Sequence, residues 1–385
     1  MKQWRRASGV LKDTNSLWTA ALLRRSKYIH PDLETAVIKA TSHDERVVDH
    51  KSTQLVFAWI RTSVVHLLPF MRTLSRRMKR TCSSIVAMKG LILLHGVLCT
   101  KIPAVRKIGR LPFDLSDFSD GYSDPSKRWS FNAFVRAYFA FLDQKSVLLS
   151  RDFHDETVKL KEDFDDHRKI KLEEEPIAQK LAELQILQTM LDRLLDVRPR
   201  GRGMNEVVVL EVMDCVIIEV FDVYSKICDG IADVLIRIYG AAGTVEAAIA
   251  LEVLQRATRQ GDELANYFEI CREIGLLNAS QCPKLERIPR DDIRELQRII
   301  NGVSAGKSTH CSDAVEEDKA IFVVGEQRIV EGEEAHKPLP SLTTTTTHKW
   351  EVFDDDLKVG DLIDLSDEAE NTTILSLSYH HQLQI

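Results

Sequence analysis

Hydrophobic and polar residues follow a helical period over most of the first 300 positions of this chain. Residues 31–42 begin with a proline, which is favoured in the first turn of a helix, and they place Leu33, Ala36, Val37 and Ala40 on one face. The segment 82–99 is apolar on most sides, as expected of a central buried helix. Strand-like alternation is scarce and the connections are short, so the pattern predicts an all-α fold, an α-solenoid of stacked helical hairpins. The same period predicts further helices at 53–63, 66–79, 129–150, 176–197, 206–239, 245–273 and 291–301.

The character of the sequence changes at about residue 302. Beyond this point an acidic run at 331–334 and a threonine run at 343–347 replace the periodic pattern. Such a composition buries too little apolar surface to offset the entropy of an ordered chain. The sequence therefore predicts a helical domain over 1–302 and a disordered acidic tail over 303–385.

Composition narrows the possible classes of protein. Glycine and proline number only 17 and 11 among 385 residues, which disfavours a turn-rich all-β fold. The seven cysteines form no C-x-x-C pair, so we expect reduced thiols in a cytoplasmic protein. No apolar run reaches the roughly 18 residues of a membrane span, and no secretory signal is visible. We find no spacing of nucleophile and base and no cluster of metal ligands, so we expect no catalytic residues, no metal and no cofactor.

The charge is distributed unevenly. Residues 1–110 carry 21 Lys and Arg against 6 Asp and Glu, whereas residues 311–385 carry 5 against 17. A basic head predicts a polyanionic partner, and the alternative is a merely solvated basic face. Because no nucleic-acid recognition motif accompanies the basic residues, we expect an anionic membrane and no nucleic acid. The basic residues gather in two groups: Arg24, Arg25 and Lys27, and Arg72, Arg76, Arg77, Lys79 and Arg80.

The first residues of the chain also suggest an amphipathic helix. Between positions 11 and 23 its apolar residues include Leu11, Leu17, Trp18, Ala21 and Leu22. Such a helix either inserts at a membrane interface or packs against the solenoid, and the sequence leaves both open.

Several sequence blocks together resemble a known family. Residues 36–43 read Ala-Val-Ile-Lys-Ala-Thr-Ser-His, and the blocks 88–95, 113–118 and 134–143 carry further matches. Over about residues 20–300 the chain resembles the ANTH-type clathrin-assembly proteins, which are endocytic adaptors, in their plant branch. The resemblance implies an ANTH-like α-solenoid.

The resemblance also implies a site for phosphoinositide headgroups. Its Lys-Ala-Thr-x-His element places Lys39 and His43 in this site, and its later Lys-x-Lys-His cluster adds His50 and Lys51. This chain departs from the cluster at two positions, where Asp49 stands for the first lysine and Ser52 for the histidine. We expect the change from Lys to Asp to weaken membrane binding on the order of 10- to 30-fold, at about 1 kcal/mol per charge.

Two short motifs of the tail resemble coat-binding peptides. Leu362, Ile363, Asp364 and Leu365 resemble a clathrin box, whose alternate apolar side chains enter a groove of the clathrin heavy chain. Upstream, Trp350, Phe353 and Asp355 resemble the W-x-x-F-x-acid peptide that the appendages of the plasma-membrane clathrin adaptor complex bind.

The resulting interpretation is a non-enzymatic clathrin-assembly adaptor of endocytosis, which links phosphoinositide-containing membrane to the clathrin coat. Phosphatidylinositol 4,5-bisphosphate is its candidate lipid. The resemblance adds an R-SNARE cargo and a peripheral location on clathrin-coated pits and vesicles of the plasma membrane, with the Golgi as a further location. The alternative function is a helical protein-interaction scaffold or SNARE-cargo binder without specific lipid recognition.

Overall fold

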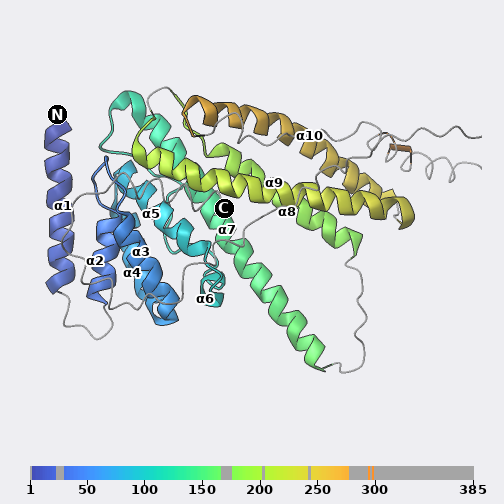
Figure 1. Cartoon of the computed structure of the whole chain (residues 1–385), viewed down its shortest axis with the longest axis horizontal. Helices are drawn as coiled ribbons and strands as arrows, with labels where there is room; N and C mark the ends of the chain where they lie inside the picture. Colours follow the sequence, from blue (N-terminus) through green and yellow to red (C-terminus); the bar gives the residue numbers. More distant parts are fainter. Residues whose placement is uncertain are drawn as a thin grey trace, which may run out of the picture. The chain divides into compact units, whose positions relative to one another are not determined.

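The computed structural model describes residues 2–22, 30–165, 176–201, 204–241 and 244–276, together with residues 294, 297 and 298. Within these ranges every regular element is a helix, which confirms the expected all-α fold (Figure 1). None of the described helices is long and apolar enough to cross a membrane. The elements are α1 (Lys2–Leu22), α2 (Pro31–Ala40), α3 (His50–Thr62), the 3-10 helix η2 (Val64–His66), α4 (Leu67–Arg80), α5 (Ser84–Leu98), α6 (Pro103–Arg106), α7 (Pro125–Asp165), α8 (Ile177–Asp196), α9 (Val207–Ala241) and α10 (Thr244–Glu273).

Most helix boundaries differ from the predicted ones by a few residues. Helix α7 begins at Pro125 rather than at 129, because proline suits the first helical turn, and it continues to Asp165 through a polar stretch without an apolar period. The pattern missed the four-residue helix α6. The predicted helix at 291–301 lies largely outside the described residues.

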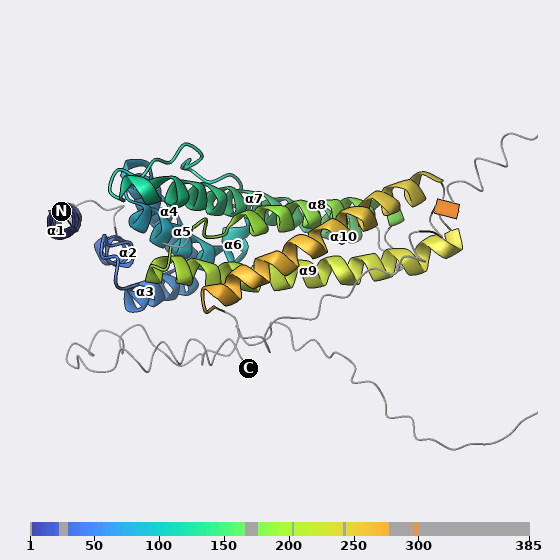
Figure 2. The same cartoon turned by 90° about the horizontal axis from the view of Figure 1, so that it is seen from above.

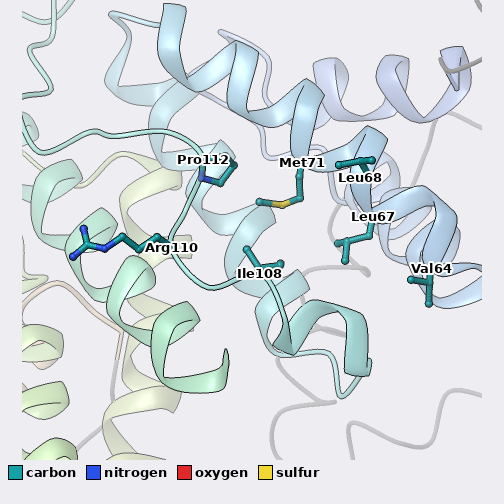
Figure 3. A pocket seen from close by; sticks show the side chains of 7 residues that line it. All are labelled: Val64, Leu67, Leu68, Met71, Ile108, Arg110 and Pro112. Carbon is teal, nitrogen blue, oxygen red and sulfur yellow. The ribbon is translucent and has the colours of Figure 1, made fainter. Parts of the chain in front are cut away.

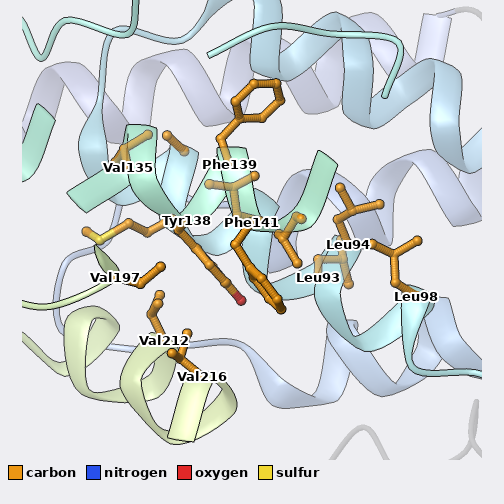
Figure 4. Close-up of a cluster of buried hydrophobic side chains, with 14 of the residues drawn as sticks. Leu93, Leu94, Leu98, Val135, Tyr138, Phe139, Phe141, Val197, Val212 and Val216 are labelled. Atoms are coloured by element: carbon orange, nitrogen blue, oxygen red, sulfur yellow. The ribbon is translucent and has the colours of Figure 1, made fainter. Parts of the chain in front are cut away.

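Helix α5 is the centre of the main hydrophobic core. It is buried on nearly every side, as the run of apolar residues predicts. Its Leu94 and Leu98 share this core with Phe141 of α7 and with Val212 and Val216 of α9 (Figure 4). A fully buried side chain of this size contributes about 1.5 to 3 kcal/mol. Helix α5 therefore joins the first helices of the chain to the later ones.

A second, smaller core lies between the long helices α8, α9 and α10. Leu181 and Leu184 of α8 pack there with Val234 of α9 and with Ala250 and Leu254 of α10. The three helices run side by side in Figure 2 and extend beyond the part of the fold that contains α2 to α6.

The described cysteines differ in their exposure. Of the five, only Cys271 is buried. Cys82, Cys99 and Cys228 are exposed, and Cys215 is half-buried. None of these five cysteines forms a disulfide bond. Cys99 belongs to a polar cluster that is described below.

Candidate functional site

The structure places Lys39 and Lys51 at the ends of two successive helices. Lys39 lies in the last turn of α2, where a cation complements the helix dipole, and Lys51 lies in the first turn of α3. Both side chains are exposed. Helix α2 ends at Ala40 and is followed by its C-cap Thr41, whose hydroxyl donates to the carbonyl oxygen of Val37 at 2.6 Å. The connection 41–49 is thus flanked by the two lysines that match the family motif, Lys39 before it and Lys51 after it.

A buried lysine holds this connection in place. The Nζ of Lys89, on α5, donates to Ser42 Oγ at 3.1 Å and to the carbonyl oxygens of Asp44 at 2.7 Å and Val47 at 2.6 Å. These three acceptors use all three protons of the ammonium group. Burial lowers the pKa of Lys89 from 10.5 to about 8, with Asp44 and other nearby carboxylates acting in the opposite direction. The sequence places Lys89 in a matching block, and the structure shows what its side chain does.

His43 is fastened to the first helix. Its backbone N–H donates to Asp13 Oδ2 at 2.8 Å, and its Nδ1 lies 2.8 Å from Asp13 Oδ1. Arg77 of α4 binds the same carboxylate at 2.7 Å and donates to the carbonyl oxygen of Thr41 at 2.6 Å. Burial acts to raise the pKa of Asp13, but the hydrogen bonds from His43 and Arg77 outweigh it and lower the pKa below its ordinary value. His43 therefore joins α1 to the connection 41–49, and its contact with a headgroup stays a prediction.

The two positions that depart from the family cluster form a helix cap. Asp49 is the N-cap of α3: its Oδ1 accepts from the backbone N–H of Ser52 at 2.9 Å, and its Oδ2 accepts from the Ser52 hydroxyl at 2.6 Å. The Ser52 side chain is buried. A histidine at position 52 would thus be overpacked in this structure, and a lysine at position 49 would leave α3 without its cap.

His50 begins α3 and points towards α9. Its Nε2 lies 3.5 Å from Glu211 Oε1, and the hydrogen bond with Glu211 raises the pKa of His50. The imidazole remains 46% exposed. A partly exposed histidine with a raised pKa adds positive charge beside Lys51 in mildly acidic conditions.

Helix α4 divides its basic residues between two faces. Arg77 points inward, as described above, and Arg76 pairs with Glu34 of α2. Arg72, Lys79 and Arg80 are exposed, and no carboxylate among the described residues forms an ion pair with them. The cationic surface of α4 is therefore smaller than the sequence suggested.

A groove runs beside this exposed face. Leu67, Leu68 and Met71 of α4 line its apolar end opposite Ile108 and Pro112, with a volume of about 360 Å³ (Figure 3). The adjoining hollow of about 470 Å³ is basic, and its lining includes Arg72, Arg76, Lys79 and Arg80. This basic hollow is a second place at which an anionic group could bind.

Helix α1 has a packed face and an exposed apolar face. Gly9 lies against His43, where an added Cβ would come within 2.7 Å of the His43 Cβ, and Ala20 is buried. On the other side Val10, Leu11 and Trp18 are 63%, 70% and 66% exposed. The sequence left open whether this helix packs against the solenoid or inserts at a membrane interface. In the structure one face of α1 packs against the fold, and the other face remains exposed and apolar.

Several predicted site residues lie outside the described residues. They are the basic group Arg24, Arg25 and Lys27, the adaptor motif Trp350, Phe353 and Asp355, and the clathrin-box motif Leu362, Ile363, Asp364 and Leu365. The structure brings together the part of the site on α2 and α3. It adds Asp13, Arg77 and Lys89, which sequence reasoning did not assign to the site.

Comparison with known proteins agrees with this fold. The ANTH domain matches residues 32–302, well over half of the chain. "Putative clathrin assembly protein At1g25240" of Arabidopsis thaliana is 46% identical over 356 residues, covering 92% of this chain and 88% of that protein. "Putative clathrin assembly protein At1g68110" of the same plant is 39% identical over 363 residues, covering 94% of this chain and 90% of that protein. This chain therefore belongs to the ANTH-domain family, among the clathrin assembly proteins of plants.

Proposed function

We propose that this protein is a non-enzymatic endocytic adaptor that binds phosphoinositide-containing membrane through residues 1–302 and the clathrin coat through residues 303–385. The names of its relatives, which are clathrin assembly proteins, support the coat function. The observation that carries the membrane function is the pair of exposed lysines, Lys39 and Lys51, at two adjoining helix ends.

The proposed membrane contact is an electrostatic one at the surface of the fold. Ammonium groups from the end of α2 and the start of α3 suit a phosphorylated inositol headgroup, such as that of phosphatidylinositol 4,5-bisphosphate. Each basic side chain near an anionic bilayer contributes about 1 kcal/mol, and this contribution is screened by salt. Binding should therefore be weakened strongly by salt.

The exposed face of α1 supplies the apolar part of the proposed contact. Val10, Leu11 and Trp18 are free of the core, while Asp13 on the same helix is tied to His43 and Arg77. An amphipathic helix of this kind lies in the interface with its apolar face among the lipid chains. Its attachment to the connection 41–49 would keep the apolar and cationic contacts on one surface.

The coat contacts are proposed for the tail. Leu362, Ile363, Asp364 and Leu365 would bind the clathrin heavy chain, and Trp350, Phe353 and Asp355 would bind the appendage of the clathrin adaptor complex. Several weak peptides on one tail act through effective concentration. We place the protein in the cytoplasm, peripherally on plasma-membrane clathrin-coated pits and vesicles. An R-SNARE cargo and a Golgi pool remain expectations from the family.

Vesicle co-sedimentation tests the membrane function. Changing Lys39→Glu together with Lys51→Glu should abolish binding to vesicles that contain phosphatidylinositol 4,5-bisphosphate, because two attractive charges become repulsive. Both side chains are exposed, so the helical circular dichroism should stay unchanged. The matched control makes the same change of charge on α9 and α10, with Lys226→Glu and Arg259→Glu, and should bind like wild type. Equal loss in both double variants would mean that only net charge matters and would contradict the assigned site.

A second candidate function is favoured by one observation, the carboxylate of Asp49 at the start of α3. It occupies the N-terminal position at which a helix would otherwise attract a phosphate. In this alternative the fold is a protein-interaction scaffold without headgroup specificity. Vesicles of equal total charge, with phosphatidylserine in place of the phosphoinositide, distinguish the two functions. A scaffold should bind both kinds of vesicle equally and weakly. In that case the double change Arg72→Glu with Lys79→Glu should weaken vesicle binding as much as the double change of Lys39 and Lys51 to glutamate does.

A further inference from the structure

A cluster of possible metal-ligating side chains lies between α5 and α9, where His95 is buried. His95 lies in the last turn of α5 and Cys99 is the C-cap of this helix, so the two, four residues apart, lie on one face. Helix α9 contributes Glu219. Imidazole, thiolate and carboxylate are the three side-chain types that bind zinc in proteins.

The ligand atoms of this cluster already lie close together. His95 Nε2 is 3.1 Å from Glu219 Oε1, and Cys99 Sγ is 3.4 Å from the same oxygen. The three ligand atoms all lie within 4.8 Å of one another. In a tetrahedral site with bonds of about 2.0 to 2.3 Å, the distances between ligand atoms are about 3.3 to 3.6 Å. The observed distances are close to these values.

We propose that His95, Cys99 and Glu219 form a zinc-binding site that joins α5 to α9, with a water as the fourth ligand. Thiolate and imidazole ligands favour Zn²⁺ over Mg²⁺ or Ca²⁺. No spacing of residues in the sequence indicates this site, because Cys99 and Glu219 lie 120 positions apart.

The surroundings supply an outer shell of the kind that orients metal ligands. Tyr138 of α7 lies 2.8 Å from His95 Nδ1, which leaves Nε2 directed at Glu219 and the proposed metal position. Lys145 of α7 contacts the Glu219 carboxylate. Burial acts to raise the pKa of Glu219, but the hydrogen bond with His95 and the charge of Lys145 outweigh it and keep the carboxylate ionised.

Charge and access also fit a zinc ion. The Cys99 thiolate and the Glu219 carboxylate carry two negative charges, which Zn²⁺ balances. Zinc would bind Nε2 of the neutral His95 ring and release the thiol proton of Cys99. His95 is only 3% exposed, whereas Cys99 is exposed and gives an ion a way in from solvent.

Zinc binding by the full-length chain tests this proposal. After removal of metals with a chelator, titration against a chromophoric zinc indicator should show a site that Cys99→Ser weakens by about tenfold or more, because a change of even an outer-shell partner of a metal costs about this much. Cys228→Ser, an exposed cysteine elsewhere on α9, is the matched control and should leave the affinity unchanged. Cobalt in place of zinc should give the sulfur-to-metal absorption band of a thiolate complex, and Cys99→Ser should lose this band.

A second measurement needs no variant. Iodoacetamide labels both Cys99 and Cys82, which are exposed in the same chain. Zinc should slow the labelling of Cys99 by about tenfold or more, if it is a metal ligand, and leave that of Cys82 unchanged. Equal labelling of Cys99 with and without zinc, or undiminished zinc affinity in Cys99→Ser, would overturn the proposal and leave the cluster as an ion-pair network of His95, Glu219 and Lys145.

Discussion

Replacing Asp49 by lysine should have opposite effects on membrane binding and on stability. The position corresponds to a family lysine, so the change restores a cationic side chain beside Lys51. In this structure, however, Asp49 also caps α3 through the backbone N–H and the hydroxyl of Ser52. The substitution therefore gains charge at the membrane surface and loses a helix cap.

The two magnitudes follow from the same residue. The local charge changes by two units, and about 1 kcal/mol per charge near an anionic surface gives about 2 kcal/mol, or a 10- to 30-fold gain in affinity after screening. Loss of an N-cap costs about 1 kcal/mol of stability, within a range of about 0.5 to 2. A domain with an unfolding free energy of about 5 to 15 kcal/mol remains folded after such a loss. Both effects are therefore measurable in one variant.

Asp49→Asn provides the control, because asparagine caps helices as well as aspartate does but carries no charge. It should tighten binding to phosphoinositide vesicles by about fivefold, because it changes the charge by one unit and so gains half of the free energy that Asp49→Lys gains. It should leave the midpoint of urea unfolding unchanged. Vesicle co-sedimentation at about 0.1 M salt and urea unfolding followed by circular dichroism measure the two quantities. If Asp49→Lys and Asp49→Asn bind vesicles no more tightly than wild type, the start of α3 does not face the membrane and our reasoning is refuted.

The remaining predictions concern three other features. Lys89→Met should lower the free energy of unfolding by about 1 to 3 kcal/mol, because buried acceptors lose their donor. The pKa of Lys89 in the folded protein is about 8, below the ordinary 10.5. Between these two pH values the folded chain therefore binds fewer protons than the unfolded chain. Urea unfolding should thus show that the stability of the wild type, relative to the variant, rises with pH in this range. Glu211→Gln should lower the pKa of His50 in an NMR titration. Since that pKa is raised in the folded protein, the stabilisation by His50 is complete below about pH 6.5 and disappears as pH rises through the folded pKa. Leu362→Ala with Leu365→Ala should abolish clathrin pull-down by the full-length chain and spare the adaptor appendage, because buried apolar anchors dominate peptide binding.

The helices were predictable because each buries one face, and a buried face leaves a local period in the sequence. Leu33, Ala36, Val37 and Ala40 were expected on the inner face of α2, and all four are buried. The exposure of Lys39 follows from the same pattern. The period also contained a signal that we missed on α4: Arg77 lies next to the buried Met78 and one turn from Leu74, which places it nearer the core than Arg72 or Lys79.

The polar contacts of the site could not be predicted in this way. His43 and Asp13 are 30 positions apart, and Lys89 reaches acceptors 42 to 47 positions away. No local period encodes such pairs, because they depend on how whole helices pack. The N-cap at Asp49 was readable, since aspartate before a helix is a common cap. We interpreted that residue only as the loss of a lysine.

The buried and the exposed lysines of this site therefore have separable roles. Lys89 donates to the backbone of the connection 41–49 and positions it, whereas Lys39 and Lys51 lie at its ends and face solvent. A change at Lys89 should thus reduce stability and membrane binding together, while changes at Lys39 and Lys51 should reduce binding alone. Because Asp13 ties α1 to His43 of the same connection, the placement of the apolar face of α1 also depends on Lys89. A single buried ammonium group thereby supports both the cationic and the apolar part of the proposed membrane contact.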